Sequence, residues 1–251
     1  MSRASKHLKA ILSWCLDLIF PRSCLGCGQD GSYLCRDCRD SLPIASCANC
    51  PFCGRRSPTG YACQKCRRQH HSSISGILIA SDWNNLLLRQ IIYEYKYRFV
   101  KELADPLSNL ATNFLERIDF IKTLRCSETE IIVIPVPLHK KRLAWRGFNQ
   151  SELLAQQISK KFNTAVNNDI LIRSRHMLPQ REVADKKARA ANIKNAFALS
   201  PKLNLNDDAI KNKIIILVDD ICTTGSTFQD CARALAPLKP KEIWGLVIAR
   251  G

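Results

Sequence analysis

Residues Ile215–Thr227 read IILVDDICTTGST, and this stretch decides the fold. Four apolar residues predict a buried parallel strand, Asp219 and Asp220 follow at its end, and seven mostly small residues lead into a helix. Two carboxylates held at a strand end can accept hydrogen bonds from two ribose hydroxyls. The small residues let backbone N–H groups and hydroxyls surround a phosphate near the positive end of the helix. The stretch therefore predicts a site for a phosphorylated sugar.

The chain on both sides of this loop alternates strand-like and helix-like segments from residue 72 onward. Such alternation predicts an α/β fold with a mostly parallel sheet flanked by helices, and a ligand beyond the carboxyl ends of the strands. The expected strands are Ile74–Ala80, Glu130–Val136, Asp169–Arg173, Ala196–Leu199, Lys213–Val218 and Glu242–Ala249. The expected helices are Asn84–Phe114, as one or two pieces, Ser151–Phe162 and Thr227–Leu238.

Composition divides the 251 residues into three regions: an apolar helix at 1–22, a cysteine-rich module at 23–71 and the α/β domain at 72–251. The net charge of +16, from 38 basic and 22 acidic residues, suggests an anionic partner: a nucleic acid, a phosphorylated metabolite or a membrane surface.

The amino-terminal segment Met1–Phe20 resembles a signal peptide only faintly, because Asp17 interrupts its apolar run and no small-residue cleavage site follows. Leu8–Phe20 is also too short to span a bilayer. We therefore expect a cytoplasmic protein. The apolar run predicts an amphipathic helix that packs on its own chain or lies on a membrane surface.

Ten of the thirteen cysteines lie between Cys15 and Cys66, and eight of them form four CxxC pairs. Two such pairs complete a tetrahedral zinc site, so the module predicts two structural Zn²⁺ ions. Interleaved pairing stays open, Cys47 could replace Cys50, and an iron–sulfur cluster or a redox CxxC are the competing interpretations. The natural grouping is Cys24, Cys27, Cys35 and Cys38 in one site, and Cys50, Cys53, Cys63 and Cys66 in the other.

The cysteine-rich module has too small a core to fold without metal, so a purely structural role is one interpretation. The other is contact with single-stranded nucleic acid, through phosphate contacts and base stacking. The candidate residues for that contact are Arg36, Arg39, Phe52, Arg55, Arg56, Tyr61, Lys65, Arg67 and Arg68.

Basic residues follow the strand Glu130–Val136 and supply a second half of the site. Arg142 and Arg146 are candidates for pyrophosphate recognition, or else the solvated start of a helix. The polar stretch Ser174–Asn195 predicts a mobile hood from which Arg181, Lys187 and Arg189 close onto phosphate, or a surface loop. His139 could act as an acid or base, and Cys222 as a redox thiol, although packing roles are the simpler expectation.

The thirteen-residue loop resembles the signature of type I phosphoribosyltransferases at every position. This resemblance implies that Asp219 and Asp220, the catalytic candidates, bind the ribose 2- and 3-hydroxyls. It implies that Mg²⁺ bridges ribose and pyrophosphate oxygens of phosphoribosyl pyrophosphate. The 5-phosphate would be held by Thr223, Thr224, Gly225, Ser226 and Thr227.

The segment PVPLHKKRLAWRGFNQSELLA (135–155), with Pro179-Gln180, Arg189, Asn192 and Ala196-Phe197, resembles the ComF competence family. So does the arrangement of a double zinc ribbon before a type I phosphoribosyltransferase domain. The resemblance implies that Lys96 also binds substrate. The family usually has a glycine three residues after this lysine, and here Phe99 occupies that position.

The resemblance implies a role in natural transformation, with binding of incoming single-stranded DNA at the inner face of the cytoplasmic membrane. Other competence proteins there would be partners. Phosphoribosyl transfer is implied but lacks a visible acceptor site. A nucleotide-salvage phosphoribosyltransferase and a non-catalytic sensor of phosphoribosyl pyrophosphate stay as alternatives.

Overall fold

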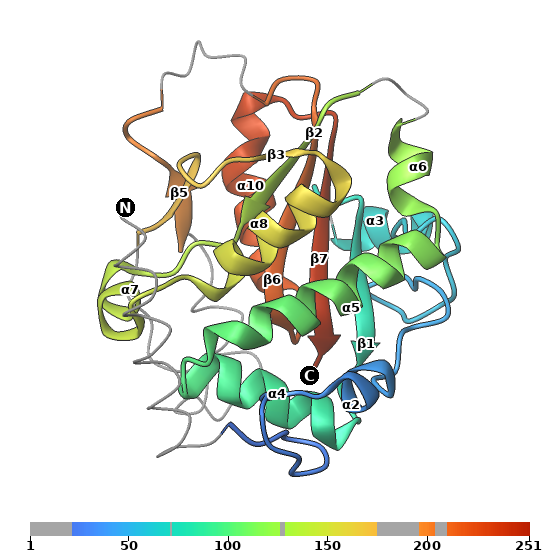
Figure 1. The fold of residues 1–251 in the computed structure, drawn as a ribbon. Coiled ribbons are helices and arrows are strands. Elements are labelled where there is room, and N and C mark those ends of the chain that lie inside the picture. Colours follow the sequence, from blue (N-terminus) through green and yellow to red (C-terminus); the bar gives the residue numbers. More distant parts are fainter. Residues whose placement is uncertain (1–21, 71, 126–128, 175–195, 204–209) are drawn as a thin grey trace.

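The computed structural model describes residues 22–70, 72–125, 129–174, 196–203 and 210–251. At its centre is a five-stranded sheet in which every neighbouring pair runs parallel (Figure 1). This confirms the predicted α/β class. The strand order is β1-β7-β6-β2-β3, with β1 at Gly76–Asp82, β2 at Ile131–Pro135, β3 at Ala165–Val166, β6 at Ile214–Cys222 and β7 at Glu242–Arg250.

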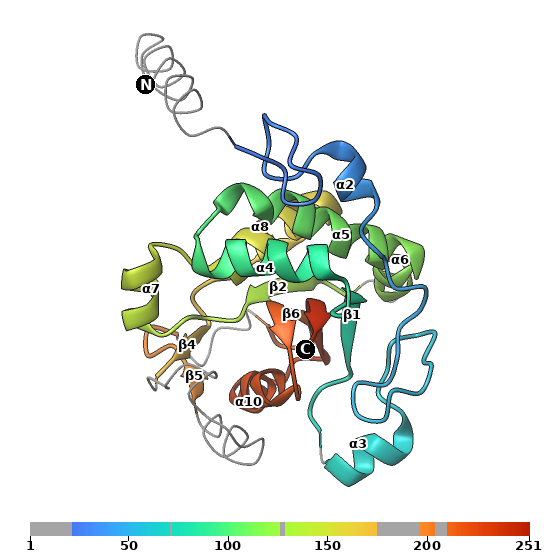
Figure 2. The same cartoon turned by 90° about the horizontal axis from the view of Figure 1, so that it is seen from below.

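Helices cover both faces of this sheet, as Figure 2 shows. One face carries α4 (Leu86–Tyr97), α5 (Ala104–Arg117), α6 (Phe120–Arg125) and α8 (Gln150–Phe162), and the other carries α10 (Ser226–Leu235). Because alternate residues of a strand face opposite sides, β6 serves both cores. Ile216 packs in the core under α4, α5 and α8, whereas Leu217 packs in the core under α10.

A separate antiparallel pair, β4 (Leu171–Arg173) and β5 (Phe197–Leu199), packs against α10. The buried carboxylate of Asp230 on α10 accepts hydrogen bonds from the backbone amides of Ala196 and Phe197, at 2.8 and 3.0 Å. This contact explains why so short a strand pair has a fixed position beside the sheet.

The expected helix at Asn84–Phe114 consists of two pieces. Asn85 caps α4 by accepting the Leu88 amide at 2.8 Å, and the chain then turns at Phe99, whose φ of 61° lies in the left-handed region. A short 3₁₀ helix, η1 (Lys101–Leu103), leads into α5. Left-handed backbone interrupts a helix, so the break follows from the conformation of one residue.

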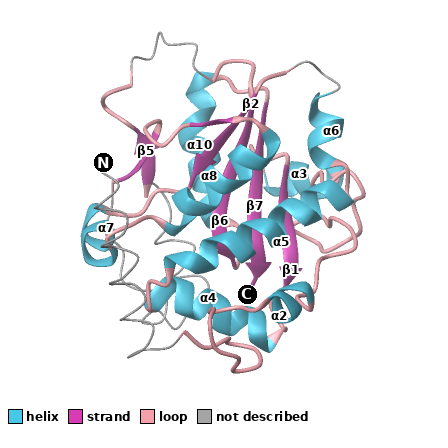
Figure 3. Ribbon diagram, viewed as in Figure 1, coloured by secondary structure: helices cyan, strands magenta, loops and turns pink. Residues whose placement is uncertain are grey.

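The cysteine-rich module lies against the β1 edge of the sheet (Figure 3). Its two short helices are α2 (Arg36–Asp40) and α3 (Gln64–His70). The Ala45 amide donates to Ala80 O at 2.8 Å, and the Ala62 amide donates to Ser75 O at 2.7 Å. Leu42 of the module belongs to the same buried cluster as the residues beneath α4 and α5. The module is therefore joined to the sheet by backbone hydrogen bonds and by a shared core.

Three features differ from the expectations. Strand β6 continues through Asp219 to Cys222 instead of ending at Val218, because Asp219, Ile221 and Cys222 remain in register with β7. The two-residue strand β3 and the helix α6 were not predicted, since both are too short to show a period. The 3₁₀ helix η3 (Ala236–Leu238) continues α10 over the last three residues of the helix expected there.

The amino-terminal segment 1–22 lies outside the described residues except for Arg22. Among the helices of the described ranges, none has the length and apolar character needed to cross a bilayer.

We predict that Gly76→Ala destabilises the junction between module and sheet. A Cβ at residue 76 would collide with the Gly60 carbonyl oxygen and would lie 2.6 Å from the Trp244 ring. The backbone atom cannot rotate away, so we expect a loss of about 1–3 kcal/mol in the free energy of unfolding. Chemical denaturation measures this loss. Gly251→Ala is the control, because its Cβ meets only the Trp83 side chain, at 3.3 Å; equal losses in the two variants would contradict the prediction.

Candidate functional site

The carboxyl end of β6 presents two adjacent carboxylates with different surroundings. Asp220 is 4% exposed, and Lys96 Nζ from α4 lies 2.7 Å from its Oδ1. The Ile221 amide donates to the same oxygen at 2.7 Å. A buried carboxylate needs such compensation. The structure thus pairs two of the predicted site residues, Lys96 and Asp220.

Asp219 is the more accessible of the two carboxylates. Its Oδ1 accepts hydrogen bonds from Ser151 Oγ at 2.8 Å and from the Asp220 amide at 2.9 Å. Desolvation and the charge of Asp220 raise the pKa of Asp219 to about 7, although Lys96 and the Ser151 hydroxyl act in the opposite direction. Asp219 therefore changes its charge near neutral pH.

Helices α4 and α8 are held together next to these carboxylates. Tyr95 is fully buried, and its hydroxyl donates to the Gln150 carbonyl oxygen at 2.8 Å. Tyr95 adjoins Lys96 on α4, and Gln150 adjoins Ser151 on α8. One interhelical hydrogen bond therefore fixes the two side chains that contact Asp220 and Asp219.

The predicted phosphate loop turns directly after β6. Gly225 has a φ of 82° and is the N-cap residue of α10, so the N-cap position itself offers no side chain to the helix start. A Cβ at residue 225 would also meet Ile77 at 3.0 Å, so both backbone conformation and space favour glycine. Thr224 Oγ1 and Ser226 Oγ lie 2.6 Å apart, and the Ser226 amide donates to Thr224 Oγ1. These groups and the helix start form an anion-binding geometry.

Arginines from separate segments lie near the carboxylates. Arg142 and Arg146 belong to α7 (Lys140–Arg146), and Arg173 lies on β4. Burial lowers the pKa of both Arg146 and Arg173, and the positive charge of Arg142 lowers both further. Guanidinium groups that repel one another in this way attract a polyanion such as pyrophosphate, which would relieve the repulsion. Arg189 and the rest of the expected hood, 175–195, lie outside the described residues.

Two buried nitrogen donors at this edge have no hydrogen-bond partner among the described residues: Arg146 Nε and Gln150 Nε2. Gln150 as a residue is 2% exposed. Buried donors are normally satisfied, so these two require a partner beyond the described residues, such as a water molecule or a ligand.

The structure gives packing roles to two residues considered for chemistry. His139 caps α7, because its Nδ1 accepts the Lys141 amide at 3.2 Å. Cys222 is buried, and burial raises the pKa of its thiol to about 11. Since the thiolate is the reactive form, this favours the interpretation of Cys222 as a small packing residue.

Arg250 at the end of β7 connects the phosphate loop to the cysteine-rich module. Its Nε donates to the Thr223 carbonyl oxygen at 3.1 Å, and its Nη1 donates to the Pro51 carbonyl oxygen at 2.6 Å. Pro51 lies inside the CxxC pair Cys50/Cys53. One guanidinium thus joins a zinc knuckle to the loop that would hold phosphate.

The eight paired cysteines form two clusters, in the grouping that the sequence favoured. Within each cluster all four sulfur atoms lie within 4.8 Å of one another. The Cys27 and Cys35 sulfurs are 3.7 Å apart, and the Cys53 and Cys63 sulfurs are 3.8 Å apart. A tetrahedral zinc with Zn–S bonds of about 2.3 Å places its sulfurs about 3.8 Å apart, so both clusters fit Zn²⁺. Interleaved pairing is excluded.

The two clusters repeat one local geometry. The first cysteine sulfur accepts a backbone amide from the third cysteine, at 3.3 Å in Cys24 and 3.4 Å in Cys50. Burial acts to raise the pKa of both thiols, but backbone donors outweigh it and lower the pKa. Thiolate is the form that binds zinc. Cys47 belongs to neither cluster, and its sulfur lies 3.9 Å from Asn49 Oδ1.

The aromatic residues of the module are used in packing. Tyr61 donates to the Glu242 carboxylate at 2.9 Å and packs edge-on against Trp244, with ring centroids 4.6 Å apart. Phe52 packs against the small core around Cys50 and Cys66. The interpretation of Tyr61 and Phe52 as base-stacking residues is therefore not supported by their surroundings.

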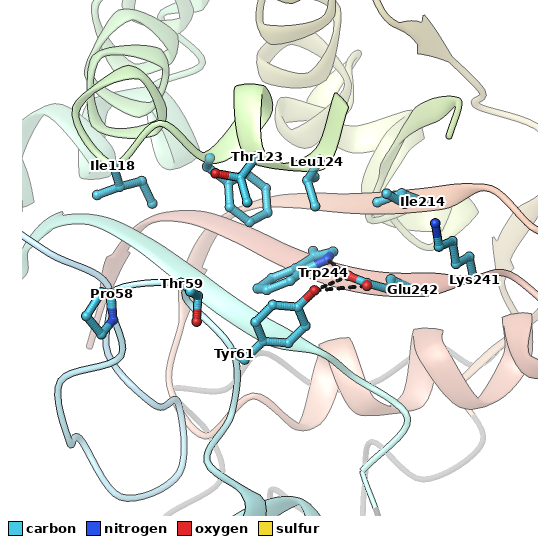
Figure 4. Close-up of a pocket in the computed structure, with 11 residues that line it drawn as sticks. Pro58, Thr59, Tyr61, Ile118, Thr123, Leu124, Ile214, Lys241, Glu242 and Trp244 are labelled. Atoms are coloured by element: carbon cyan, nitrogen blue, oxygen red, sulfur yellow. Dashed lines mark hydrogen bonds between the residues drawn. The ribbon is translucent and has the colours of Figure 1, made fainter. Parts of the chain in front are cut away.

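Tyr61 also lines a cavity of about 220 Å³ between the module and α6 (Figure 4). Ile214 and Glu242, the first residues of β6 and β7, lie in its wall. The cavity is thus at the amino edge of the sheet, opposite the carboxylates, and it does not belong to the candidate site.

Sequence reasoning missed Ser151, Gln150, Arg173 and Arg250. Ser151 lies 68 positions from its carboxylate partner, and Arg250 lies 199 positions from Pro51. No local pattern marks such contacts. The one available signal was the position of Ser151 directly after the RGFNQ segment.

Two family models match the chain. Residues 15–67 match the double zinc ribbon domain, and residues 149–250 match the phosphoribosyl transferase domain. Competence protein F of Haemophilus influenzae is 31% identical over 236 residues, which cover 87% of this chain and 98% of that protein. DNA utilization protein YhgH of Escherichia coli is 28% identical, with 80% of this chain and 90% of that protein covered. Competence protein ComFC of Bacillus subtilis is 24% identical, with 80% and 77% covered.

Solved structures with some likeness include a hypoxanthine-guanine phosphoribosyl transferase from L. donovani and a purine phosphoribosyltransferase from Pyrococcus horikoshii. The first has a TM-score of 0.35 and 13% identity over 59% of this chain and 71% of that one. The second has a TM-score of 0.31 and 14% identity over 58% and 83%. At these scores the likeness adds nothing to the fold already described.

We predict that replacing a cysteine inside a cluster lowers the zinc content, whereas replacing Cys47 outside the clusters does not. Cys50→Ser removes a ligand, so its zinc content should fall from about two to about one per chain. Cys47→Ser should keep both ions and the wild-type unfolding transition. Metal analysis by mass spectrometry, together with thermal denaturation, measures both. Loss of zinc in Cys47→Ser would contradict the cluster assignment.

Proposed function

Because the chain belongs to the ComF family of competence proteins, we propose that it binds phosphoribosyl pyrophosphate with Mg²⁺ and contacts single-stranded DNA during natural transformation. The observation that carries this proposal is the convergence, at one edge of the sheet, of Asp219, Asp220 and the glycine-led start of α10. Arg142, Arg146 and Arg173 supply opposite charge at the same edge.

Each part of the ligand has a matching group. The partly exposed Asp219 accepts hydrogen bonds from a ribose hydroxyl, and Asp220 reaches the second hydroxyl beside its Lys96 partner. The loop Thr223–Thr227 encloses the 5-phosphate with backbone amides and hydroxyls. The arginines bind pyrophosphate through charge-assisted hydrogen bonds.

The site fits Mg²⁺ only together with the ligand. In the ranges that the structure describes, the groups of three or more possible ligand residues consist of cysteines, and no carboxylate cluster of that size occurs. Mg²⁺ favours oxygen ligands and is commonly held by one or two carboxylates with substrate phosphates. Asp219 and Asp220 would supply the carboxylates, and the metal would neutralise pyrophosphate charge.

Transfer at this site would break the bond between ribose C1 and pyrophosphate and form a bond from C1 to a nucleophile. The developing positive charge at C1 lies near the two carboxylates, and the departing pyrophosphate is stabilised by the arginines. The test measures pyrophosphate release in the presence of a panel of bases and amines. Release with any of them identifies an enzyme, including one of the nucleotide-salvage type, and no release with any of them favours a protein that only senses the ligand.

The proposed contact with DNA uses the second ribbon, at the inner face of the cytoplasmic membrane. Arg55, Arg56, Lys65, Arg67 and Arg68 are exposed there. In the first ribbon, Arg36 and Arg39 both lie beside Asp40, at 3.7 and 3.4 Å. The second ribbon therefore offers the less compensated positive surface to a phosphate backbone.

We predict that Asp219→Asn weakens the binding of phosphoribosyl pyrophosphate and Mg²⁺ by at least about tenfold, since a lost charged hydrogen bond costs about 1.5–3 kcal/mol. Wild-type affinity should rise with pH through the raised pKa of Asp219, about 7, because the ionised form accepts hydroxyl protons. The variant should lose this pH dependence. Titration calorimetry at several pH values measures both.

Asp82→Asn is the matched control, because Asp82 is exposed and ends β1, which is separated from β6 by β7, at the same edge of the sheet. It should bind as the wild type does. Equal affinities for wild type and Asp219→Asn would refute the assignment of the loop.

We predict that Arg55→Glu/Arg56→Glu weakens the binding of single-stranded DNA and reduces its salt dependence, because each lost phosphate contact removes about 0.7 from the slope of log affinity against log salt. Fluorescence anisotropy with a labelled oligonucleotide measures this. Arg36→Glu/Arg39→Glu changes the net charge equally but should have the smaller effect. If both double variants behave alike, the second ribbon is not a specific contact.

A further inference from the structure

Stacking on nucleobases requires aromatic rings that are not already used in packing. Phe52 and Tyr61 of the cysteine-rich module do not meet this condition, since one packs in the ribbon core and the other against Trp244. The search for a stacking surface therefore moves to the phosphoribosyltransferase-like domain. Helix α7, at the margin of the molecule in Figures 1 and 2, offers one.

Helix α7 exposes its apolar side chains and buries none of its residues. Trp145 is 66% exposed and Leu143 is 40% exposed. By contrast, Trp244 is fully buried and Trp83 is partly buried. A helix that packs for stability alone would turn its tryptophan inward.

Trp145 is nevertheless held in a defined place by Phe99. The two rings meet edge to face, with centroids 4.9 Å apart and an interplanar angle of 85°. In such a pair at most one face of the indole is covered by its partner. Phe99 also packs against Phe148, at 6.4 Å, and the Arg146 guanidinium lies 5.9 Å from its ring centroid. A supported and exposed indole is a preorganised platform for a planar ligand.

Phe99 adopts an unusual backbone conformation at this position. Its φ of 61° is in the region that favours glycine. Strained residues persist where the surroundings over-determine them, and they cluster at functional sites. The turn after α4, in which the Arg98 and Val100 amides both donate to Glu94 O, fixes this backbone, and the ring of Phe99 then contacts Trp145 and Phe148.

The two segments that form the platform are rich in basic residues. The segments 95–101 and 131–151 contain seven lysines and arginines and no aspartate or glutamate. The contacts of Phe99 with Trp145 and of Lys101 with Phe148 bring these segments together. Exposed cations around an exposed ring match a phosphate backbone whose bases stack. A membrane surface would need a broader apolar face than Leu143 and Trp145 provide.

We propose that Trp145, supported by Phe99, is a stacking platform for a base of single-stranded DNA. The phosphates would be held by the exposed cations Arg98, Lys101, Lys140 and Lys141. This inference rests on the proposed DNA binding and deepens it. Arg146 follows Trp145 and interacts with the charge of Asp220, so a strand on the platform would pass beside the phosphate site.

The test uses the full chain and a fluorescein-labelled oligothymidylate of 30 nucleotides. Trp145→Ala should weaken binding by about tenfold or more, as for the loss of one stacked base. Its salt slope should equal that of the wild type, because no charge is removed. Trp145→Phe should retain part of the affinity. Quenching of intrinsic fluorescence by unlabelled DNA should be reduced in Trp145→Phe.

Phe99→Gly is a second variant, since glycine adopts the observed φ freely but removes the ring beneath Trp145. It should also weaken DNA binding. Leu86→Ala is the matched control: Leu86 is 74% exposed on α4 but is absent from the aromatic cluster, so its loss should leave affinity unchanged. Calorimetry with phosphoribosyl pyrophosphate and Mg²⁺ should show unchanged affinity in Trp145→Ala.

Each outcome has a distinct consequence. If the wild type does not bind the oligonucleotide, both the proposed DNA binding and the platform fail. If the wild type binds and Trp145→Ala binds equally well, the platform alone fails. If Trp145→Ala loses affinity for phosphatidylglycerol vesicles but not for DNA, α7 is a membrane contact and the inference is overturned.

Discussion

Two adjacent carboxylates at the end of the central strand impose the main constraint on this fold. Asp219 and Asp220 follow the apolar part of β6 near its carboxyl end, where unpaired buried charge would cost several kcal/mol. Each has its own compensation: Lys96 for Asp220 and Ser151 for Asp219. These partners come from α4 and α8, which Tyr95 and Gln150 tie together. The position of the two helices on the sheet is therefore linked to the chemistry of its edge, and the candidate ligand site also holds the two helices in place.

The same edge connects the two parts of the chain. Arg250 bonds simultaneously to Thr223 of the phosphate loop and to Pro51 of the second zinc knuckle. Metal ligation fixes the backbone of a knuckle, so the Pro51 carbonyl is a firm anchor only when the cluster is formed. The ribbon therefore acts on the loop through one guanidinium, whether or not it also contacts DNA. A structural and a functional interpretation of the ribbon are not exclusive in this geometry.

Local chemistry made the strands, the turn from β6 into α10 and the cysteine grouping predictable. Ile215–Val218 are a buried run followed by acids, and each CxxC pair can bind metal from one turn. Contacts between distant segments were not predictable. Ser151 and Arg250 reach partners far away in the chain, and the continuation of β6 past Val218 depends on its pairing with β7. The sequence suggested Tyr61 as a base-stacking residue, because it lies among basic residues. In the structure it instead packs against Trp244 and donates a hydrogen bond to Glu242.

The backbone conformation of Phe99 and the contacts of its ring have different causes. The family resemblance led us to expect glycine, and the left-handed φ of 61° gives the physical reason: the turn between α4 and η1 needs that conformation. The turn keeps this conformation although residue 99 is a bulky phenylalanine. The position therefore requires a left-handed backbone and does not require the small size of glycine. Because the ring then has a fixed direction, it meets Trp145 and Phe148. The unusual backbone conformation of Phe99 thereby helps to order the cluster of Phe99, Trp145 and Phe148. This cluster lies next to Arg146, which interacts with the charge of Asp220.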